Sequence, residues 1–382
     1  MTEKLYRADA YLTQFSSTVL EMQDKAVRLE ATAFYPSAGG QAFDTGFLNG
    51  LAVLETKEEA SEIWHLLDGT LELGQVVTGQ INWARRFDHM QQHTGEHLLG
   101  QAFFRLGRHV MAVNMEHSVC TLDLEGETTW ETALQAESDV CEAIWAALPI
   151  LGYELPDSEI ARVPLRRTPK VSGLIRVVQI GDYDYSACGG THLANSSQVG
   201  MLKIFKIERI KGGSSRVYFN CGRRLLVDYR LKHDFMAGLA LGLSTSLEAV
   251  PTRIAALQED FGMAKKQISD LKTQLAQRLV ASFHSGIVTH ELDDASLLHE
   301  VAKICLQRPR LLALLAARDG ACGLLAVACG AEVPHNANLV LQIGLPHIGG
   351  KGGGKADLAQ GSGLNPDGLS AALEAMQAAV RS

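Results

Sequence analysis

The sequence changes character at Asp88-His-Met-Gln-Gln-His-Thr-Gly-Glu-His-Leu-Leu-Gly-Gln-Ala-Phe-Phe-Arg-Leu-Gly107. Apolar residues and histidines recur here every three or four positions, which predicts a helix that ends at Gly107. His93 and His97 are four residues apart, so both imidazoles project from one face of this helix. Metal ligands commonly use this spacing.

A second group of metal-binding residue types stands in Ala187-Cys-Gly-Gly-Thr-His192. Cys188 and His192 flank two glycines, which let the backbone fold tightly around an ion. With His93 and His97 they offer three imidazole nitrogens and one thiolate, a set that suits Zn²⁺. We therefore expect one zinc ion per chain, held by these four residues.

A competing interpretation comes from the same helix. His93-Thr-Gly-Glu-His97 matches H-x-x-E-H, the pattern of inverted zinc peptidases, in which Glu96 would be a general base. In the present set a thiolate replaces the downstream carboxylate ligand of such enzymes, which disfavours a peptidase.

The sequence before this helix has a β pattern. Short alternating runs are interrupted by turn residues at 36–40, 46–50 and 68–69, which predicts a small N-terminal barrel over residues 1–85. Residues 86–232 combine the helix with another at 129–148 and with strands near 154–163, 173–180, 201–208 and 215–220. This is the pattern of an α+β domain.

A heptad pattern follows in residues 233–282. Apolar residues occupy nine successive a and d positions: Leu247, Val250, Ile254, Leu257, Phe261, Ala264, Ile268, Leu271 and Leu275. This predicts a coiled-coil arm, which could pair two chains into a homodimer through residues 247–275. The alternative is a helix that lies on a globular core.

The last segment, residues 283–382, is expected to be a glycine-rich α/β domain. Strands are predicted at 287–292, 310–317, 323–329 and 338–343, with helices at 295–306 and 367–380. Between them lies Gly349-Gly-Lys-Gly-Gly-Gly-Lys355, which is not a nucleotide-binding P-loop. Its backbone amides and two lysines suit an RNA phosphate, and the alternative is a flexible linker.

Composition limits the function classes. The 382 residues are 46% hydrophobic and 20% charged, and no run of 18 apolar residues predicts a membrane helix. The N-terminus lacks an apolar signal core, and the seven cysteines are scattered, so we expect a cytoplasmic protein without disulfides. The net charge is −8, yet residues 162–176 and 206–232 are rich in Lys and Arg and could form one patch for a polyanion.

Taken together, the motifs resemble one family, the alanyl-tRNA editing proteins called AlaX in their long form, and the editing and C-terminal domains of alanyl-tRNA synthetase. The matching pieces, in order, are Thr32-Ala-Phe-Tyr-Pro-Ser-Ala-Gly-Gly-Gln41, residues 93–99, 178–192 and 212–218, and the glycine-rich stretch 349–360. The resemblance implies a zinc-dependent hydrolase that deacylates alanine tRNA mischarged with serine or, second, glycine. No aminoacylation domain is recognised, so tRNA charging is not expected.

The resemblance also implies roles for individual residues. It implies catalytic roles for Thr32, which would sense the serine hydroxyl, and for Gln41, His93 and His97. The residues expected to contact substrate are Gly39, Gly40, Arg216, Gly349, Lys351 and Lys355. The ordinary alternatives are a strand threonine, a hairpin turn at Gly39-Gly40, and a Gln41 that caps this turn instead of placing a water.

Two questions stay open at this point. Zinc could activate a water or only position the substrate, and four protein ligands normally make a closed, structural site unless one of them, such as His192, is displaceable. A second class of function is therefore a non-catalytic tRNA-binding module with a structural zinc.

Overall fold

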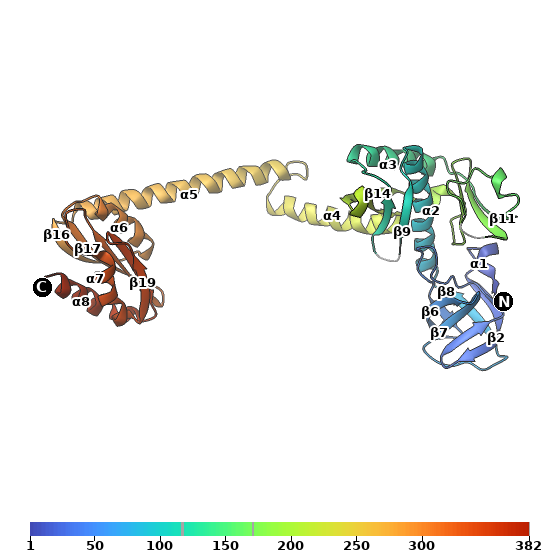
Figure 1. Ribbon diagram of the computed structural model, residues 1–382, viewed down its shortest axis with the longest axis horizontal. Coiled ribbons are helices and arrows are strands. Elements are labelled where there is room, and N and C mark those ends of the chain that lie inside the picture. Colours follow the sequence, from blue (N-terminus) through green and yellow to red (C-terminus); the bar gives the residue numbers. More distant parts are fainter. Residues whose placement is uncertain (116–117, 170–171, 382) are drawn as a thin grey trace. The chain divides into compact units, whose positions relative to one another are not determined.

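The computed structural model describes residues 1–115, 118–169 and 172–381. The chain divides into two compact units, Met1–Gly238 and the chain from Leu239 onward (Figure 1). Both units combine helices with β-sheets, which confirms the predicted mixed α+β architecture.

Six strands of the first unit close into a small barrel in the order β2-β3-β7-β6-β5-β8. Successive side chains of a strand point to opposite faces. In β8, buried Val77 and Ile81 therefore alternate with exposed neighbours, and the buried side chains fill the interior of the barrel. The elements of this region are β1 (Glu3–Lys4), α1 (Leu5–Ala8), β2 (Gln14–Gln23), β3 (Ala26–Leu29), β4 (Ala31–Thr32), β5 (Gly46–Leu48), β6 (Leu51–Glu59), β7 (Glu62–Leu67) and β8 (Val76–Ile81).

The predicted histidine helix is α2 (Trp83–Arg105), which follows the barrel directly. It begins five residues before Asp88 because Asn82 caps it, accepting a hydrogen bond from the backbone N–H of Arg85. Most of α2 is buried, including polar residues such as Gln92 and Glu96. A helix that buries polar side chains needs partners for them; Gln92, for example, donates to the backbone oxygen of Cys221 at 3.0 Å and accepts from its backbone N–H at 2.8 Å.

Two sheets and a second helix surround α2. A four-stranded sheet has the order β14-β15-β10-β9, and a three-stranded sheet has the order β11-β12-β13. Leu98, Leu99 and Phe103 of α2 lie in the same core as side chains of both sheets and of α3. The bounds are β9 (Val110–Asn114), β10 (Cys120–Leu124), α3 (Trp130–Trp145), β11 (Ile150–Pro156), β12 (Leu174–Ile180), β13 (Asp184–Ala187), β14 (Leu202–Arg209), β15 (Ser215–Cys221) and α4 (Gly222–Gly242).

The second unit is built on a five-stranded sheet with the order β16-β17-β18-β20-β19. Side chains from α7 and α8 pack on one face of this sheet, and those from α6 and the end of α5 pack on the other. The bounds are α5 (Val250–Ala281), β16 (Gly286–Leu292), α6 (Leu298–Leu306), β17 (Leu311–Asp319), β18 (Cys322–Cys329), α7 (Ala337–Gly344), β19 (Gly350–Gly354), β20 (Leu358–Gly363) and α8 (Leu369–Arg381).

One expectation for this unit is wrong, and one alternative is not observed. Residues 338–343, predicted as a strand, lie inside helix α7, because the Asn336 side chain caps the backbone N–H groups of Asn338 and Leu339. The glycine-rich stretch is neither a loop nor a flexible linker. It forms the edge strand β19, and Gly349 ends the preceding turn with a φ of +59°.

Eight of the nine heptad residues, from Val250 to Leu275, lie in one helix, α5, of 32 residues, which corresponds to a length of about 48 Å. Leu247 precedes this helix, and residues 233–242 of the predicted arm belong to α4. Near its end, Ala276 and Val280 are buried in the core that includes α6. Val250 at the start of α5 is also buried, but the heptad residues from Ile254 to Leu275 are exposed, Phe261 by 73% and Leu271 by 63%. This exposed part of the stripe has no partner within the described part of its unit. The coiled coil itself stays a prediction.

No helix of the described residues combines the length and the apolar character that crossing a bilayer requires.

Candidate metal centre

Four side chains from two segments converge on one point of the first unit. His93 and His97 come from α2, and Cys188 and His192 come from the loop after β13. Their ligand atoms all lie within 4.8 Å of one another. The three imidazoles are buried, while Cys188 is partly exposed. The structure therefore brings together the four residues that the sequence predicted as ligands, and the cluster could hold a metal ion.

The histidines direct one nitrogen each towards the centre. Cys188 Sγ lies 3.4 Å from His93 Nε2 and 3.3 Å from His192 Nε2. The opposite nitrogen, Nδ1, has its own partner in each case: Gln41 Oε1 at 2.7 Å for His93, Asp184 Oδ2 at 3.1 Å for His97, and Thr94 Oγ1 at 3.3 Å for His192. Histidine ligands of metals typically show this arrangement, because the outer partner fixes the ring and its tautomer.

The charge of the cluster suits a cation. Burial by itself would raise the pKa of the Cys188 thiol, but the imidazoles of His93 and His192 outweigh burial and hold that pKa well below its ordinary value. A thiolate beside three imidazole nitrogens is a donor set that suits zinc better than Mg²⁺ or Ca²⁺, which prefer oxygen ligands. The residues present therefore fit a zinc ion.

The loop from Cys188 to His192 depends on a glycine and an arginine. A Cβ on Gly190 would lie 2.2 Å from His93 Cε1, so only glycine allows the loop to approach the imidazole this closely. Arg176 Nη1 donates to the carbonyl oxygens of Cys188 at 2.9 Å and Gly190 at 3.0 Å. Gly189 is exposed, so the centre meets solvent on the side of Cys188 and Gly189.

Asp184 and Arg166 are functional candidates that sequence reasoning missed. The Asp184 carboxylate is buried and accepts from His97 Nδ1 and from Ser186 Oγ at 2.9 Å. Arg166 lies 3.7 Å from the same carboxylate and donates to the backbone oxygen of His97 at 3.1 Å. The sequence feature that could have indicated Asp184 is the alternation of Asp184, Ser186 and Cys188, because alternate residues of a strand lie on the same face.

Several arginines of the predicted polyanion patch bind groups of the protein itself. Arg166 lies beside Asp184, and Arg176 donates to the backbone oxygen of Cys188. Arg224 pairs with Asp88, and Arg216 pairs with Asp123. The Arg216 guanidinium makes two hydrogen bonds to that carboxylate, of 2.7 and 2.8 Å. Residues 170 and 171 of the first basic stretch lie outside the described residues.

Gly39 and Gly40 form a tight turn, with φ values of +58° and +81° between the paired residues Ala38 and Gln41. Two positive φ angles in a two-residue hairpin define a type I′ turn, in which glycine is favoured. The turn positions Gln41, which belongs to the barrel side of the unit, so that its side chain contacts His93. The hairpin alternative of the sequence analysis is therefore observed, and a contact of these glycines with substrate stays a prediction.

Thr32 is wholly buried at the end of β4, and its hydroxyl lies 2.8 Å from His65 Nε2. His65 Nδ1 lies 3.2 Å from the carbonyl oxygen of Val27, which can only accept, so Nδ1 carries the proton when the ring is neutral. Burial lowers the pKa of His65 to about 4, so the ring is neutral at pH 7. Thr32 Oγ therefore donates to His65 Nε2 and accepts from the backbone N–H of Phe34 at 3.1 Å.

Glu96 and His89 lie on the same helix but have different positions. Glu96 is buried, and its Oε2 lies 3.9 Å from His97 Nε2. His89 is not among the ligand atoms that converge within the described residues. In the second unit, Lys351 and Lys355 are exposed on β19 and just after it.

Known proteins resemble the part of the chain that carries Cys188 and His192, and the chain as a whole. Residues 175–218 match the family described as "Threonyl and Alanyl tRNA synthetase second additional domain". The chain is 31% identical over its whole length to the alanine–tRNA ligase of Pyrococcus abyssi, of which it covers 43%. It is 32% identical over 94% of its length to the ligase of Ignicoccus hospitalis, covering 41% of that protein. The chain thus spans less than half the length of these ligases.

A shorter relative matches from end to end. The alanyl-tRNA editing protein AlaX-L of Pyrococcus horikoshii is 28% identical, and the alignment covers 94% of both chains. A solved structure, the C-Ala domain of the Aquifex aeolicus alanyl-tRNA synthetase, is 26% identical, with 26% of this chain and 97% of that chain covered and a TM-score of 0.23.

The chain is therefore similar to alanyl-tRNA editing proteins and to the related part of alanine–tRNA ligases. It is a homologue of the long editing protein AlaX-L, and the resemblance predicted from the motifs is confirmed.

Proposed function

We propose that the protein is a zinc-dependent hydrolase that deacylates alanine tRNA carrying serine, and with lower preference glycine. The observation that carries this proposal is the convergence of His93, His97, Cys188 and His192 within 4.8 Å. It occurs in a chain that aligns end to end with a protein named for alanyl-tRNA editing. The reaction class is hydrolysis of a carboxylic ester, the bond between the amino acid and the terminal ribose.

The buried histidines define how an ester would approach. His93, His97 and His192 are closed off from solvent, whereas Cys188 and Gly189 face it, so substrate enters on the thiolate side. A bound zinc ion supplies a Lewis acid there, which lowers the pKa of water or polarises a carbonyl oxygen. The Nδ1–H group of His93 donates a hydrogen bond to Gln41, and that of His97 donates to Asp184. These two hydrogen bonds would keep both rings oriented during the reaction.

Serine selectivity is proposed to depend on Thr32. An alanine pocket cannot strongly reject serine, which only adds a hydroxyl, whereas a site that hydrogen-bonds this hydroxyl can reject alanine. The Thr32 hydroxyl already donates to His65 and accepts one N–H, so it has one acceptor site left for a serine O–H.

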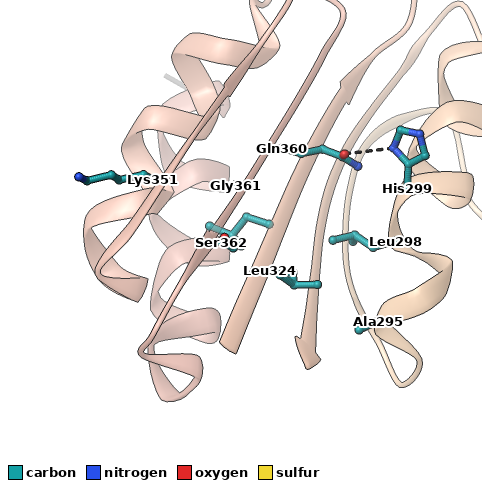
Figure 2. A pocket seen from close by; sticks show the side chains of 9 residues that line it. Ala295, Leu298, His299, Leu324, Lys351, Gln360, Gly361 and Ser362 are labelled. Atoms are coloured by element: carbon teal, nitrogen blue, oxygen red, sulfur yellow. Dashed lines mark hydrogen bonds between the residues drawn. The ribbon is translucent and has the colours of Figure 1, made fainter. Parts of the chain in front are cut away.

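The second unit is proposed to bind the tRNA body. An open groove of about 390 Å³ lies between α6 and the β19-β20 ribbon, with apolar Leu298 and Leu324 in its wall. Figure 2 shows Gln360 turned towards His299, to which it is joined by a hydrogen bond of 3.0 Å, while Lys351 extends outward from the neighbouring strand. Glycines leave the edge-strand backbone open, and with Lys351 and Lys355 it suits RNA phosphates. Arg216 in the first unit is a further candidate for phosphate contact, with part of its guanidinium committed to Asp123.

One observation favours a second candidate function. Four protein ligands around one point are the usual composition of a closed, structural zinc site, and such a site would fit a tRNA-binding module without hydrolysis. The catalytic proposal requires one ligand to leave. His192 is the candidate, because the outer partner of its Nδ1 is a hydroxyl at 3.3 Å, the longest of the three contacts.

The proposal is tested by deacylation assays with the purified, zinc-loaded protein on Ser-tRNA(Ala), Gly-tRNA(Ala) and Ala-tRNA(Ala). We expect the serine ester to be cleaved fastest, the glycine ester more slowly and the alanine ester at the background rate, with all activity lost in Cys188→Ala. Tight binding of Ser-tRNA(Ala) without cleavage would favour the binding module. Peptide cleavage that disappears in Glu96→Gln would favour the peptidase.

A further inference from the structure

Gln41 sits between two metal-ligand segments, and its amide orientation can be deduced from its neighbours. The backbone N–H of Thr191 lies 3.3 Å from Oε1 of Gln41, and a backbone N–H can only donate. The amide oxygen must therefore face this N–H. Gln41 Nε2 is then the donor to Thr191 Oγ1 at 2.8 Å, so both ends of the amide agree with one orientation.

This orientation fixes the tautomer of His93. The same Oε1 lies 2.7 Å from His93 Nδ1, and an amide oxygen can only accept, so Nδ1 must carry a proton. In the neutral ring Nε2 then holds the lone pair, and this is the nitrogen that lies 3.4 Å from Cys188 Sγ. A backbone N–H of the Cys188–His192 loop thus determines, through Gln41, which nitrogen His93 offers to the centre.

The position of Gln41 is itself held from α2. Asp44, which closes the same loop, accepts from the backbone N–H of Tyr35 at 2.7 Å. Arg86 donates to that carboxylate through Nε at 2.9 Å and through Nη2, and also to the carbonyl oxygen of Ala33. Arg86 and Asp44 are both fully buried. Because Arg86 is seven residues before His93 on α2, the loop is tied to the helix that carries two ligands.

A water-placing role fits Gln41 less well than this one. Its side chain is 1% exposed, and both its oxygen and its nitrogen already bond protein groups. All four candidate ligands lie outside residues 1–85, and Gln41 joins the barrel-side loop 33–44 to one of them, His93.

We propose that Gln41 is a positioning residue of the metal centre: its carbonyl oxygen holds His93 as the Nδ1–H tautomer, and its amide group fixes the Thr191 loop. This inference rests on the proposed zinc site and replaces a direct catalytic role for Gln41. Outer partners of this kind typically contribute about 10–100-fold to metal affinity.

The first test is zinc affinity in the full chain, measured by competition with a chromophoric chelator. Gln41→Met removes the acceptor at nearly constant volume and is expected to weaken zinc binding about 10–100-fold. Gln41→Glu keeps an oxygen acceptor for His93 and is expected to restore most of the affinity. The control is Gln179→Met, since Gln179 is a partly buried glutamine that bonds Gly181 and Tyr185 and no candidate ligand. The absorption spectrum of the Co²⁺-loaded protein should change in Gln41→Met and not in the control.

A second measurement needs no variant. Long-range ¹H–¹⁵N NMR of histidine-labelled wild-type protein should show His93 as the Nδ1–H tautomer, both without metal and with zinc. The Nε2–H tautomer would overturn the inference, as would Gln41→Met with wild-type zinc affinity. A wild-type protein that binds no zinc would instead refute the proposed function, so the two failures are distinguishable.

Discussion

At the scale of single residues, the three histidines of the centre differ in the strength of their outer partners. His97 has a buried carboxylate, His93 an amide oxygen and His192 a hydroxyl. A hydrogen bond to a charged acceptor is about twice as strong as one between neutral groups. His97 is thus the most firmly oriented ligand and His192 the least, which is the order expected if His192 is the ligand that substrate displaces.

This ranking predicts unequal costs for two outer partners. Asp184→Asn replaces a charged acceptor by a neutral one and should weaken zinc binding about tenfold. Thr94→Val removes a neutral contact of 3.3 Å to His192, together with the hydrogen bond that Thr94 Oγ1 accepts from the backbone N–H of Leu193, and should weaken zinc binding less than Asp184→Asn does. Chelator competition measures both, and equal losses or the reverse order would contradict the ranking.

Thr32→Val should reduce the ratio of Ser-tRNA(Ala) to Ala-tRNA(Ala) hydrolysis by an amount equivalent to about 1–3 kcal/mol, because one hydrogen bond to the substrate hydroxyl is lost. Hydrolysis of Gly-tRNA(Ala), which has no hydroxyl, should change little. The control is Thr78→Val, at an exposed position of the barrel. An unchanged serine-to-alanine ratio in Thr32→Val would remove Thr32 from the specificity site.

The sequence identified the four candidate ligands that the structure brings together, because they stand in two short motifs. His93 and His97 share a helix face, and Cys188 and His192 flank two glycines, so spacing alone grouped them. Asp184, Arg166 and Gln41 could not be assigned to the centre in this way. Their contacts join β13, a loop and the barrel side to α2, and no local periodicity records contacts between distant segments.

At the scale of elements, prediction succeeded where an apolar pattern was long and failed where it was short. The α2 and α5 patterns extend over several turns and were recognised as helices. Asn338–Ile343 has only six residues, four of them apolar, and such a short stretch fits a strand or a buried helix equally well. The glycine-rich stretch has no side-chain periodicity, and its strand β19 follows only from pairing with β20.

The buried Arg86–Asp44 pair connects two elements, and breaking it should destabilise the first unit. Arg86→Leu leaves the Asp44 carboxylate buried without its cation, which should cost about 3–5 kcal/mol. Arg7→Leu, which breaks an exposed pair with Glu154, should cost at most about 1 kcal/mol. All four tryptophans lie before Gly238, so their fluorescence during urea unfolding reports on this unit. Similar midpoints for the two variants would contradict the argument.

At the scale of the whole molecule, the exposed stripe of α5 raises the question of oligomeric state. Four residues of this stripe are between 39% and 73% exposed. In one heptad register, a positions are occupied by Ile254, Phe261 and Ile268, and a d position by Leu271. A second copy of the chain presents the same stripe and can cover it in a two-fold pairing.

We therefore predict a homodimer in sedimentation velocity experiments. The double variant Phe261→Glu and Leu271→Glu should be monomeric, because it places charges in the apolar seam. The double variant Ala255→Glu and Ser269→Glu adds the same charge outside the a and d positions and should stay dimeric. Identical sedimentation of wild type and both variants would contradict dimerisation through this stripe.

The role of the second unit in tRNA binding is tested on the full chain. Lys351→Ala should weaken tRNA binding and reduce the slope of log affinity against log salt by about one, as expected for one lost phosphate contact. The control is Arg381→Ala, which removes a charge from α8. This helix packs on the face of the sheet opposite to α6, so the salt slope should stay unchanged. Equal salt slopes in both variants would place the phosphate contacts elsewhere.

The central claim, that one metal ion at this cluster drives ester hydrolysis, is tested most directly by titrating zinc into the metal-free protein while measuring Ser-tRNA(Ala) deacylation. The rate should rise linearly and stop rising at one zinc ion per chain, and Cys188→Ala should show no such rise. Deacylation that proceeds at the full rate without zinc, or zinc that binds at one per chain without any deacylation, would contradict the claim.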